Sequence, residues 1–184
     1  MNRRKFLVKF AQATAAALAV GATTVTIEGC TFNITDAINT VLNSALAILK
    51  VAEPGATWAA QLASAIAALQ QAETTWQAGG AATIVIDALN TIEAVLAVIP
   101  ETAAYAPLID ILFAGIEAVM SAFGLTAQLS RAAAAKRQGI VNSPHYKAAT
   151  LNGPSFLHPT WQGAYNAQWN TKAKAIGLPQ AEIK

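Results

Sequence analysis

Apolar residues recur at steps of three and four along most of this chain, which is the spacing of one face of an α-helix. The clearest stretch is 81–124, where two such patterns meet at Pro100. Gly79 and Gly80 precede the first pattern and Gly124 follows the second, as expected at helix ends. We therefore predict two helices within 82–123. The first has a polar side formed by Asp87, Asn90, Thr91 and Glu93.

The same spacing predicts two earlier helices, one over about 35–52 and one from Pro54 to about Gln77. We expect Thr35 to cap the first of them after a short loop at 31–35. Because short connections force neighbouring helices to run in opposite directions, the sequence predicts an all-α fold. The expected architecture is an antiparallel up-down four-helix bundle.

The composition changes after this bundle. A shorter fifth helix is predicted over 126–138, followed by turn signals such as Asn142-Ser143-Pro144 and Asn152-Gly153-Pro154. A last short helix over 159–176 ends at Gly177. The irregular stretch is either disordered or a strap held against the bundle, and its aromatic content favours the strap. We predict a signal peptide at 1–29, a helical bundle at 30–139 and a C-terminal strap at 140–184 packed on the bundle.

The chain is 54% hydrophobic, and only 12% of its residues are charged, against roughly a quarter in an average soluble domain. The outer sides of the predicted helices are rich in Ala, Thr, Gln, Asn and Ser. Such a surface suits an exported protein, or one covered by its own tail or by other copies in a homo-oligomer. Residues 30–124 carry eight acidic groups and one basic group, whereas residues 125–184 carry seven basic groups and one acidic group. We expect these opposite charges to orient the strap.

A cationic start is followed by a weakly apolar run from Phe10 to Ala22, which is shorter than the roughly 20 residues that span a bilayer. This pattern is typical of a signal peptide. The pair Arg3-Arg4, with Phe6 and Leu7 after it, resembles the twin-arginine export signal of bacteria. The resemblance implies that the protein folds in the cytoplasm and then crosses the inner membrane. The alternative is a basic amphipathic tail.

The single cysteine, Cys30, ends the sequence Thr26-Ile27-Glu28-Gly29-Cys30. This segment resembles the lipobox of bacterial lipoproteins, with an aliphatic residue at −3, Gly at −1 and the acceptor Cys, although Glu28 departs from the usual residue at −2. The resemblance implies cleavage before Cys30 and a lipid anchor on it, on the periplasmic side of a bacterial membrane. Cleavage after Ala22 would instead release a soluble periplasmic or secreted protein.

Candidate catalytic groups are scattered. The two histidines, His145 and His158, have no cysteine near them and no second pair of ligands, so we expect no metal site. Asp110 and Glu117 share one face of their helix and form either a strip exposed to water or a carboxylate pair inside the bundle. The sequence has no recognisable nucleophile elbow and no glycine-rich phosphate loop. We therefore expect no cofactor, and the sequence does not indicate a reaction.

Trp161, Tyr165 and Trp169 are spaced four apart in the last predicted helix and share one face. They either dock this helix on the bundle or form an exposed aromatic platform for a glycan or partner. The nearby lysines are too few for a nucleic-acid footprint. The sequence thus favours an exported, lipid-anchored protein that acts by contact with partner proteins or envelope components. A carrier of small apolar ligands within the bundle and an enzyme of unknown reaction are the alternatives.

Overall fold

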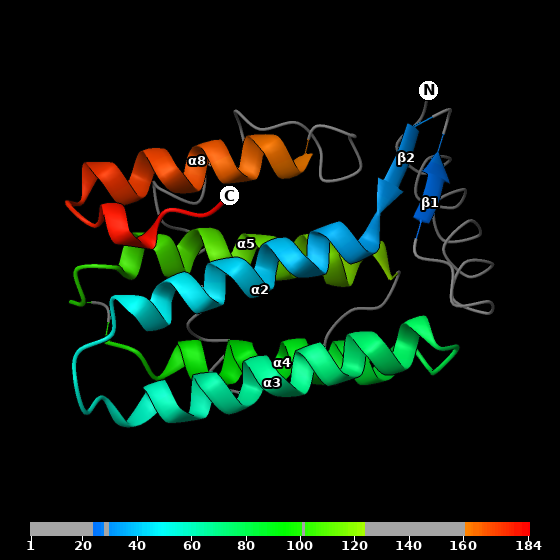
Figure 1. The fold of residues 1–184 in the computed structure, drawn as a ribbon, viewed down its shortest axis with the longest axis horizontal. Coiled ribbons are helices and arrows are strands. Elements are labelled where there is room, and N and C mark those ends of the chain that lie inside the picture. Colours follow the sequence, from blue (N-terminus) through cyan, green and yellow to red (C-terminus); the bar gives the residue numbers. More distant parts are fainter. Residues whose placement is uncertain (1–23, 28–29, 101, 124–160) are drawn as a thin grey trace.

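The computed structural model describes residues 24–27, 30–100, 102–123 and 161–184 of the 184-residue chain. Over these residues the fold is all-α, apart from one short pair of strands (Figure 1). The elements are β1 (Thr24–Ile27), β2 (Cys30–Asn33), α2 (Ile34–Lys50), α3 (Thr57–Gln77), α4 (Thr83–Ala97), α5 (Ala106–Ala122), α8 (Trp161–Ala175) and the 3-10 turn η1 (Pro179–Ala181). The predicted helix over 126–138 and the irregular stretch up to residue 160 lie outside the described residues.

The two strands at the start were not predicted. β1 and β2 pair antiparallel, with Thr24 opposite Asn33 and Ile27 opposite Cys30. β2 runs directly into α2, so the predicted loop at 31–35 is wrong. The cap of α2 is Asn33 rather than Thr35, because the Asn33 Oδ1 atom accepts a hydrogen bond of 3.3 Å from the backbone N–H of Asp36.

The apolar side of α3 matches the prediction. Trp58, Leu62, Ala65, Ile66, Leu69, Ala72 and Trp76 are all buried. α3 ends at Gln77, and Gly79, two positions later, has a φ of 96° that suits glycine. The backbone N–H of Gly80 bonds to the carbonyl of Thr75 at 2.9 Å, and that of Gly79 bonds to the carbonyl of Trp76 at 2.9 Å. This is the Schellman arrangement, and it satisfies carbonyls that would otherwise lack partners at the helix end.

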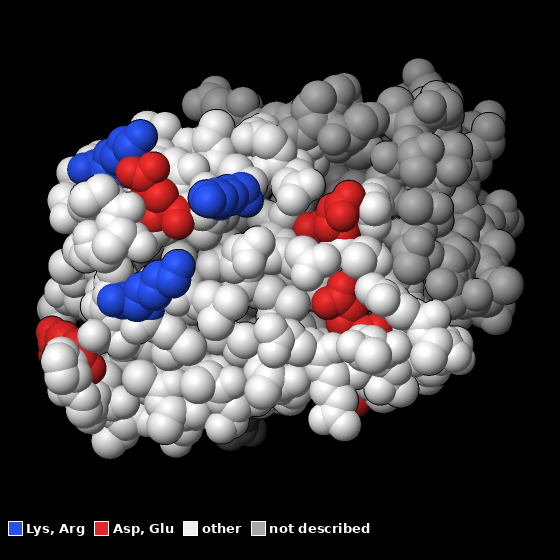
Figure 2. Space-filling model, in the orientation of Figure 1, with Lys and Arg blue, Asp and Glu red and all other residues white. Residues whose placement is uncertain are grey.

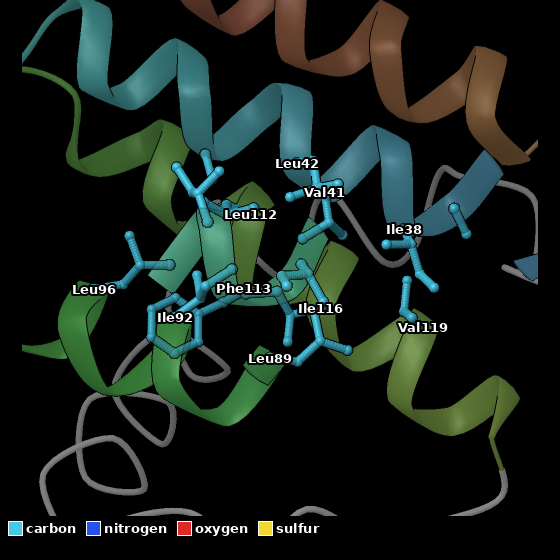
Figure 3. Packing of buried hydrophobic residues seen from close by; sticks show 14 of the residues in the cluster. Ile38, Val41, Leu42, Leu89, Ile92, Leu96, Leu112, Phe113, Ile116 and Val119 are labelled. Carbon is cyan, nitrogen blue, oxygen red and sulfur yellow. The ribbon is translucent and has the colours of Figure 1, made fainter. Parts of the chain in front are cut away.

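The helices lie lengthwise beside one another (Figure 1), and their apolar sides share one core. α3 packs mainly on α4, and α2 packs on both α3 and α5. Figure 3 shows side chains of α2, α4 and α5 pointing toward one another, including Ile38, Val41, Leu42, Leu89, Ile92, Leu96, Leu112, Phe113, Ile116 and Val119. At one end of this core the Trp76 and Phe123 rings meet edge to face, with centroids 5.2 Å apart.

Among the described residues, the acidic side chains of Glu73 and Glu93 are buried, although the sequence pattern placed Glu93 in water. Glu93 was assigned to the polar side of its helix, but it is 0% exposed. It lies four residues after Leu89 and three before Leu96, so the helical period sets it beside the apolar stripe. Glu73 is also buried on α3. Gln77 Nε2 donates a 3.1 Å hydrogen bond to its carboxylate, and burial raises the pKa of this carboxyl.

α8 packs on α5 and α2, and η1 contacts both α2 and α8. Figure 1 shows β1 and β2 at the end of the molecule where α2 begins, whereas η1 lies near the opposite end. Among the described residues, none of the helices has the length and apolar character needed to span a bilayer.

Candidate functional site

The aromatic face of α8 is turned inward in the structure. Trp161, Tyr165 and Trp169 are 8%, 6% and 0% exposed. Their rings follow one another along the helix, with centroids 5.2 Å apart for Trp161 and Tyr165 and 6.2 Å apart for Tyr165 and Trp169. The spacing of four residues places all three on the side that contacts α2 and α5. Rings buried in this way suit docking of the helix and do not form an exposed platform.

Tyr165 lies at the centre of this face and reaches α2 with its hydroxyl. The Tyr165 Oη atom donates a 3.1 Å hydrogen bond to Ser44 Oγ. Ser44 Oγ in turn donates at 2.8 Å to the backbone carbonyl of Thr40. Burial strongly raises the pKa of the Tyr165 phenol, and the hydrogen bond with Ser44 offsets only part of this rise. A phenol is protonated at neutral pH even at its ordinary pKa of about 10, and the raised pKa extends the range over which Tyr165 keeps its donor.

On its other side the Tyr165 ring lies against the backbone of α5 at Gly115. A Cβ atom placed at position 115 would lie 2.8 Å from Tyr165 Cε2 and 3.1 Å from Tyr165 Oη. Real Cβ atoms essentially never come so close to a carbon atom. The absence of a side chain at Gly115 thus makes the space into which the tyrosine fits.

The residues after α8 fold back along it. Gly177, with a φ of 75°, ends the helix, and the backbone N–H of Leu178 bonds to the carbonyl of Ala173 at 2.9 Å. Trp169 Nε1 then donates a 2.7 Å hydrogen bond to the carbonyl of Ala181. This bond satisfies the indole N–H of a fully buried ring.

The last residues are held by a second set of bonds. The side chain of Asn170 donates to the carbonyl of Ile183 and accepts from its backbone N–H, both at 2.8 Å. Lys174 Nζ and Glu182 Oε2 are 3.6 Å apart at the surface, where such a pair contributes little to stability. The hydrogen bonds of Asn170 and Trp169 therefore fix the tail on α8.

Sequence reasoning found the three rings but missed the residues that receive them. Thr40 and Ser44 of α2 are polar, yet both are buried. With Ala37 and Ala47 they form a second buried line along α2, spaced by three and four residues. This run of small side chains is the one feature of the sequence that could have indicated a docking face on α2. Without knowledge of the partner helix, it is indistinguishable from a weakly polar surface.

The other predicted residues are spread over the chain. Cys30 is the first residue of β2 and precedes the start of α2 by four positions. The export residues Arg3, Arg4, Phe6 and Leu7 and both histidines lie outside the described residues. Asp110 and Glu117 are half-buried on α5. No cluster of three metal-ligating side chains is found in the described ranges.

Over the described residues, these features define an all-α protein whose last helix packs its aromatic face against α2 and α5. In comparisons with known proteins, no family model matches the chain, and no curated protein or solved structure matches it either.

Proposed function

We propose that this is an exported, lipid-anchored protein that acts through contacts with partner proteins or envelope components rather than by catalysis. The observation that carries the proposal is the order of motifs at the N-terminus. The twin-arginine-like sequence at Arg3-Arg4 is followed by a weakly apolar run and then by the single cysteine, Cys30. Cys30 lies four positions before the start of α2.

The short distance between Cys30 and α2 supports a tethering role. Three residues separate Cys30 from Ile34, and an extended chain advances about 3.3 Å per residue. A lipid on Cys30 would therefore hold the start of α2 within roughly 13 Å of the membrane surface. In this arrangement the end of the molecule with β2 faces the membrane, and the end with η1 faces away from it (Figure 1).

The proposed body of the protein is an antiparallel up-down four-helix bundle of α2 to α5, with 140–184 as a strap that ends in α8. A shared apolar core and a last helix docked by its aromatic face suit a contact module. The outer side of α3 is a candidate contact surface, because its exposed residues are uncharged. They are Thr57, Gln61, Ser64, Gln70, Gln71, Thr74, Thr75, Gln77 and several alanines. Glu73, the single charged residue of this helix, is buried.

Two variants test export and anchoring separately. Replacing Arg3 and Arg4 together by Lys is expected to keep the protein in the cytoplasm, because the twin-arginine route requires the arginine pair. Cys30→Ala is expected to leave export intact and to move the protein from the membrane fraction into the soluble periplasmic fraction. Fractionation followed by immunoblotting measures both outcomes.

Each result bears on a different part of the proposal. Equal export of the double Lys variant would remove the twin-arginine assignment. A Cys30→Ala protein that stays in the membrane with an unchanged mass would exclude the lipid anchor on Cys30. Export with cleavage after Ala22 would remain possible.

A further inference from the structure

A groove of about 510 Å³ lies between the second half of α2 and the last residues of the chain. Its volume is in the range of small-molecule sites, roughly 300–1,000 Å³. The groove is on the outer surface and is therefore distinct from the ligand space inside the bundle that the sequence suggested. It is lined by Asn43, Leu46, Leu49, Lys50, Glu182, Ile183 and Lys184.

The groove has an apolar part formed by two leucines of α2 and one isoleucine of the tail. Leu46 is 37% exposed and is one of two large hydrophobic side chains that are exposed among the described residues. Leu49 is half-buried beside it, and Ile183 is buried. Covering an apolar strip that is open to solvent with a hydrocarbon chain lowers the free energy, because apolar surface leaves water.

Two basic side chains, Lys50 and Lys184, line the same groove. The one acidic residue of the lining, Glu182, lies 3.6 Å from Lys174 Nζ, so its charge is partly offset. Figure 2 shows basic side chains gathered on the half of this face where α2 ends and where η1 lies. The groove thus combines an apolar strip with two basic side chains and one acidic side chain, whose charge Lys174 partly offsets.

The wall formed by Ile183 is held in place by the fold. Asn170 on α8 makes two hydrogen bonds of 2.8 Å with the backbone of Ile183. The groove therefore depends on the docked tail, and it is a built feature of the structure rather than a gap beside a free chain end.

We propose that this groove binds an anionic single-chain amphiphile of the fatty-acid class. Its carboxylate lies between Lys50 and Lys184, where a charge-assisted contact replaces the hydration of both. Its acyl chain covers Leu46, Leu49 and Ile183. This activity goes beyond the proposed anchoring and does not depend on export or on lipidation.

The test is calorimetric titration of sodium oleate, below its micelle concentration, into the full chain carrying Arg3→Lys, Arg4→Lys and Cys30→Ser, which keeps lipid off the protein. We expect saturable binding at one site per chain. The double variant Lys50→Gln with Lys184→Gln is expected to weaken binding at least about tenfold, equivalent to about 1.4 kcal/mol. Lys172→Gln on α8 is the matched control and is expected to leave binding unchanged.

Two further experiments test the role of the ligand's charge and the role of the Ile183 wall separately. Oleyl alcohol, which lacks the charge, is expected to bind at least about tenfold more weakly than oleate. Asn170→Ala is expected to weaken oleate binding without any change at the lysines, because the Ile183 wall loses its two hydrogen bonds. The proposal is overturned if oleate does not bind, or if the double Lys variant or the alcohol binds as well as the reference. It is also overturned if the chain binds anionic phospholipid vesicles through these lysines but does not bind monomeric oleate.

Discussion

At the scale of single residues, Gly115 controls how closely α8 approaches the bundle. Gly115→Ala would place a Cβ atom 2.8 Å from the buried Tyr165 ring. Overpacking of this kind costs about 1–3 kcal/mol, whereas alanine gains at most about 1 kcal/mol of helix propensity. We therefore expect a net loss of stability in urea unfolding followed by tryptophan fluorescence.

Gly163→Ala is the matched control for this substitution. Gly163 lies on the exposed side of α8, and a Cβ atom added there would meet no neighbouring atom within 4 Å. The expected result is unchanged or slightly increased stability, because only the helix propensity changes. Equal behaviour of the two alanine variants would show that Tyr165 does not need the space at Gly115.

Glu73 gives a pH dependence with a definite sign. Burial raises the pKa of its carboxyl above the value in the unfolded chain, so the folded state binds the proton more tightly. Glu73 therefore reduces stability as the pH rises from the unfolded pKa, about 4.3, through the folded pKa. Glu73→Gln is expected to raise the melting temperature at pH 7, by at most about 4 °C.

The gain from Glu73→Gln is expected to shrink near pH 4, where the native carboxyl is protonated. Thermal melts of both proteins at pH 4 and pH 7 measure the difference, and Asp87→Asn on the exposed side of α4 serves as the control. A variant that is destabilised equally at both pH values would mean that the charge of Glu73 carries no cost in this fold.

At the scale of elements, α8 is attached by its aromatic face more than by its charges. Burial of each ring is worth about 1.5–3 kcal/mol, whereas the exposed Lys174–Glu182 pair is worth about 0–1 kcal/mol. The double variant Trp161→Ala with Trp169→Ala is expected to free the tail, so that proteases cleave after Gly139 much faster. Circular dichroism is expected to show that α2 to α5 remain helical.

High salt alone is expected to increase this cleavage far less than the double variant, because it weakens only the ion pairs. Gln168→Ala, a half-buried position on the same helix, is the control variant. If the wild-type tail is already cut at low salt as fast as an unfolded peptide, α8 is not held against the bundle in solution.

The helices themselves followed from the sequence, because their apolar period is regular and glycine or proline marks several of their ends. The residues that receive α8 did not follow from it. Thr40 and Ser44 are polar and small, so the pattern alone places them in water until a partner helix is known.

The pairing of β1 with β2 was also missed, since four-residue strands leave too short a pattern to distinguish from a loop. The burial of Glu93 was missed as well, because the apolar period shows which side of a helix is buried but not how wide the buried stripe is.

At the scale of the whole molecule, the proposed export signal and the proposed lipid acceptor Cys30 both precede the helical body along the chain. The short link between Cys30 and α2 sets the proposed orientation, with the groove at Lys50 and Lys184 on the half of the molecule away from the membrane. Anchoring and groove binding are separate properties, so one can fail without the other.

The intact mass of the protein purified from bacterial membranes tests the central claim most directly, because it reports cleavage and lipidation together. We expect a chain that begins at Cys30 and carries a diacylglyceryl group, with or without an amide-linked acyl chain. A mass that corresponds to an unmodified chain beginning at residue 23, or to a chain that retains its first 29 residues, would contradict the lipid anchor.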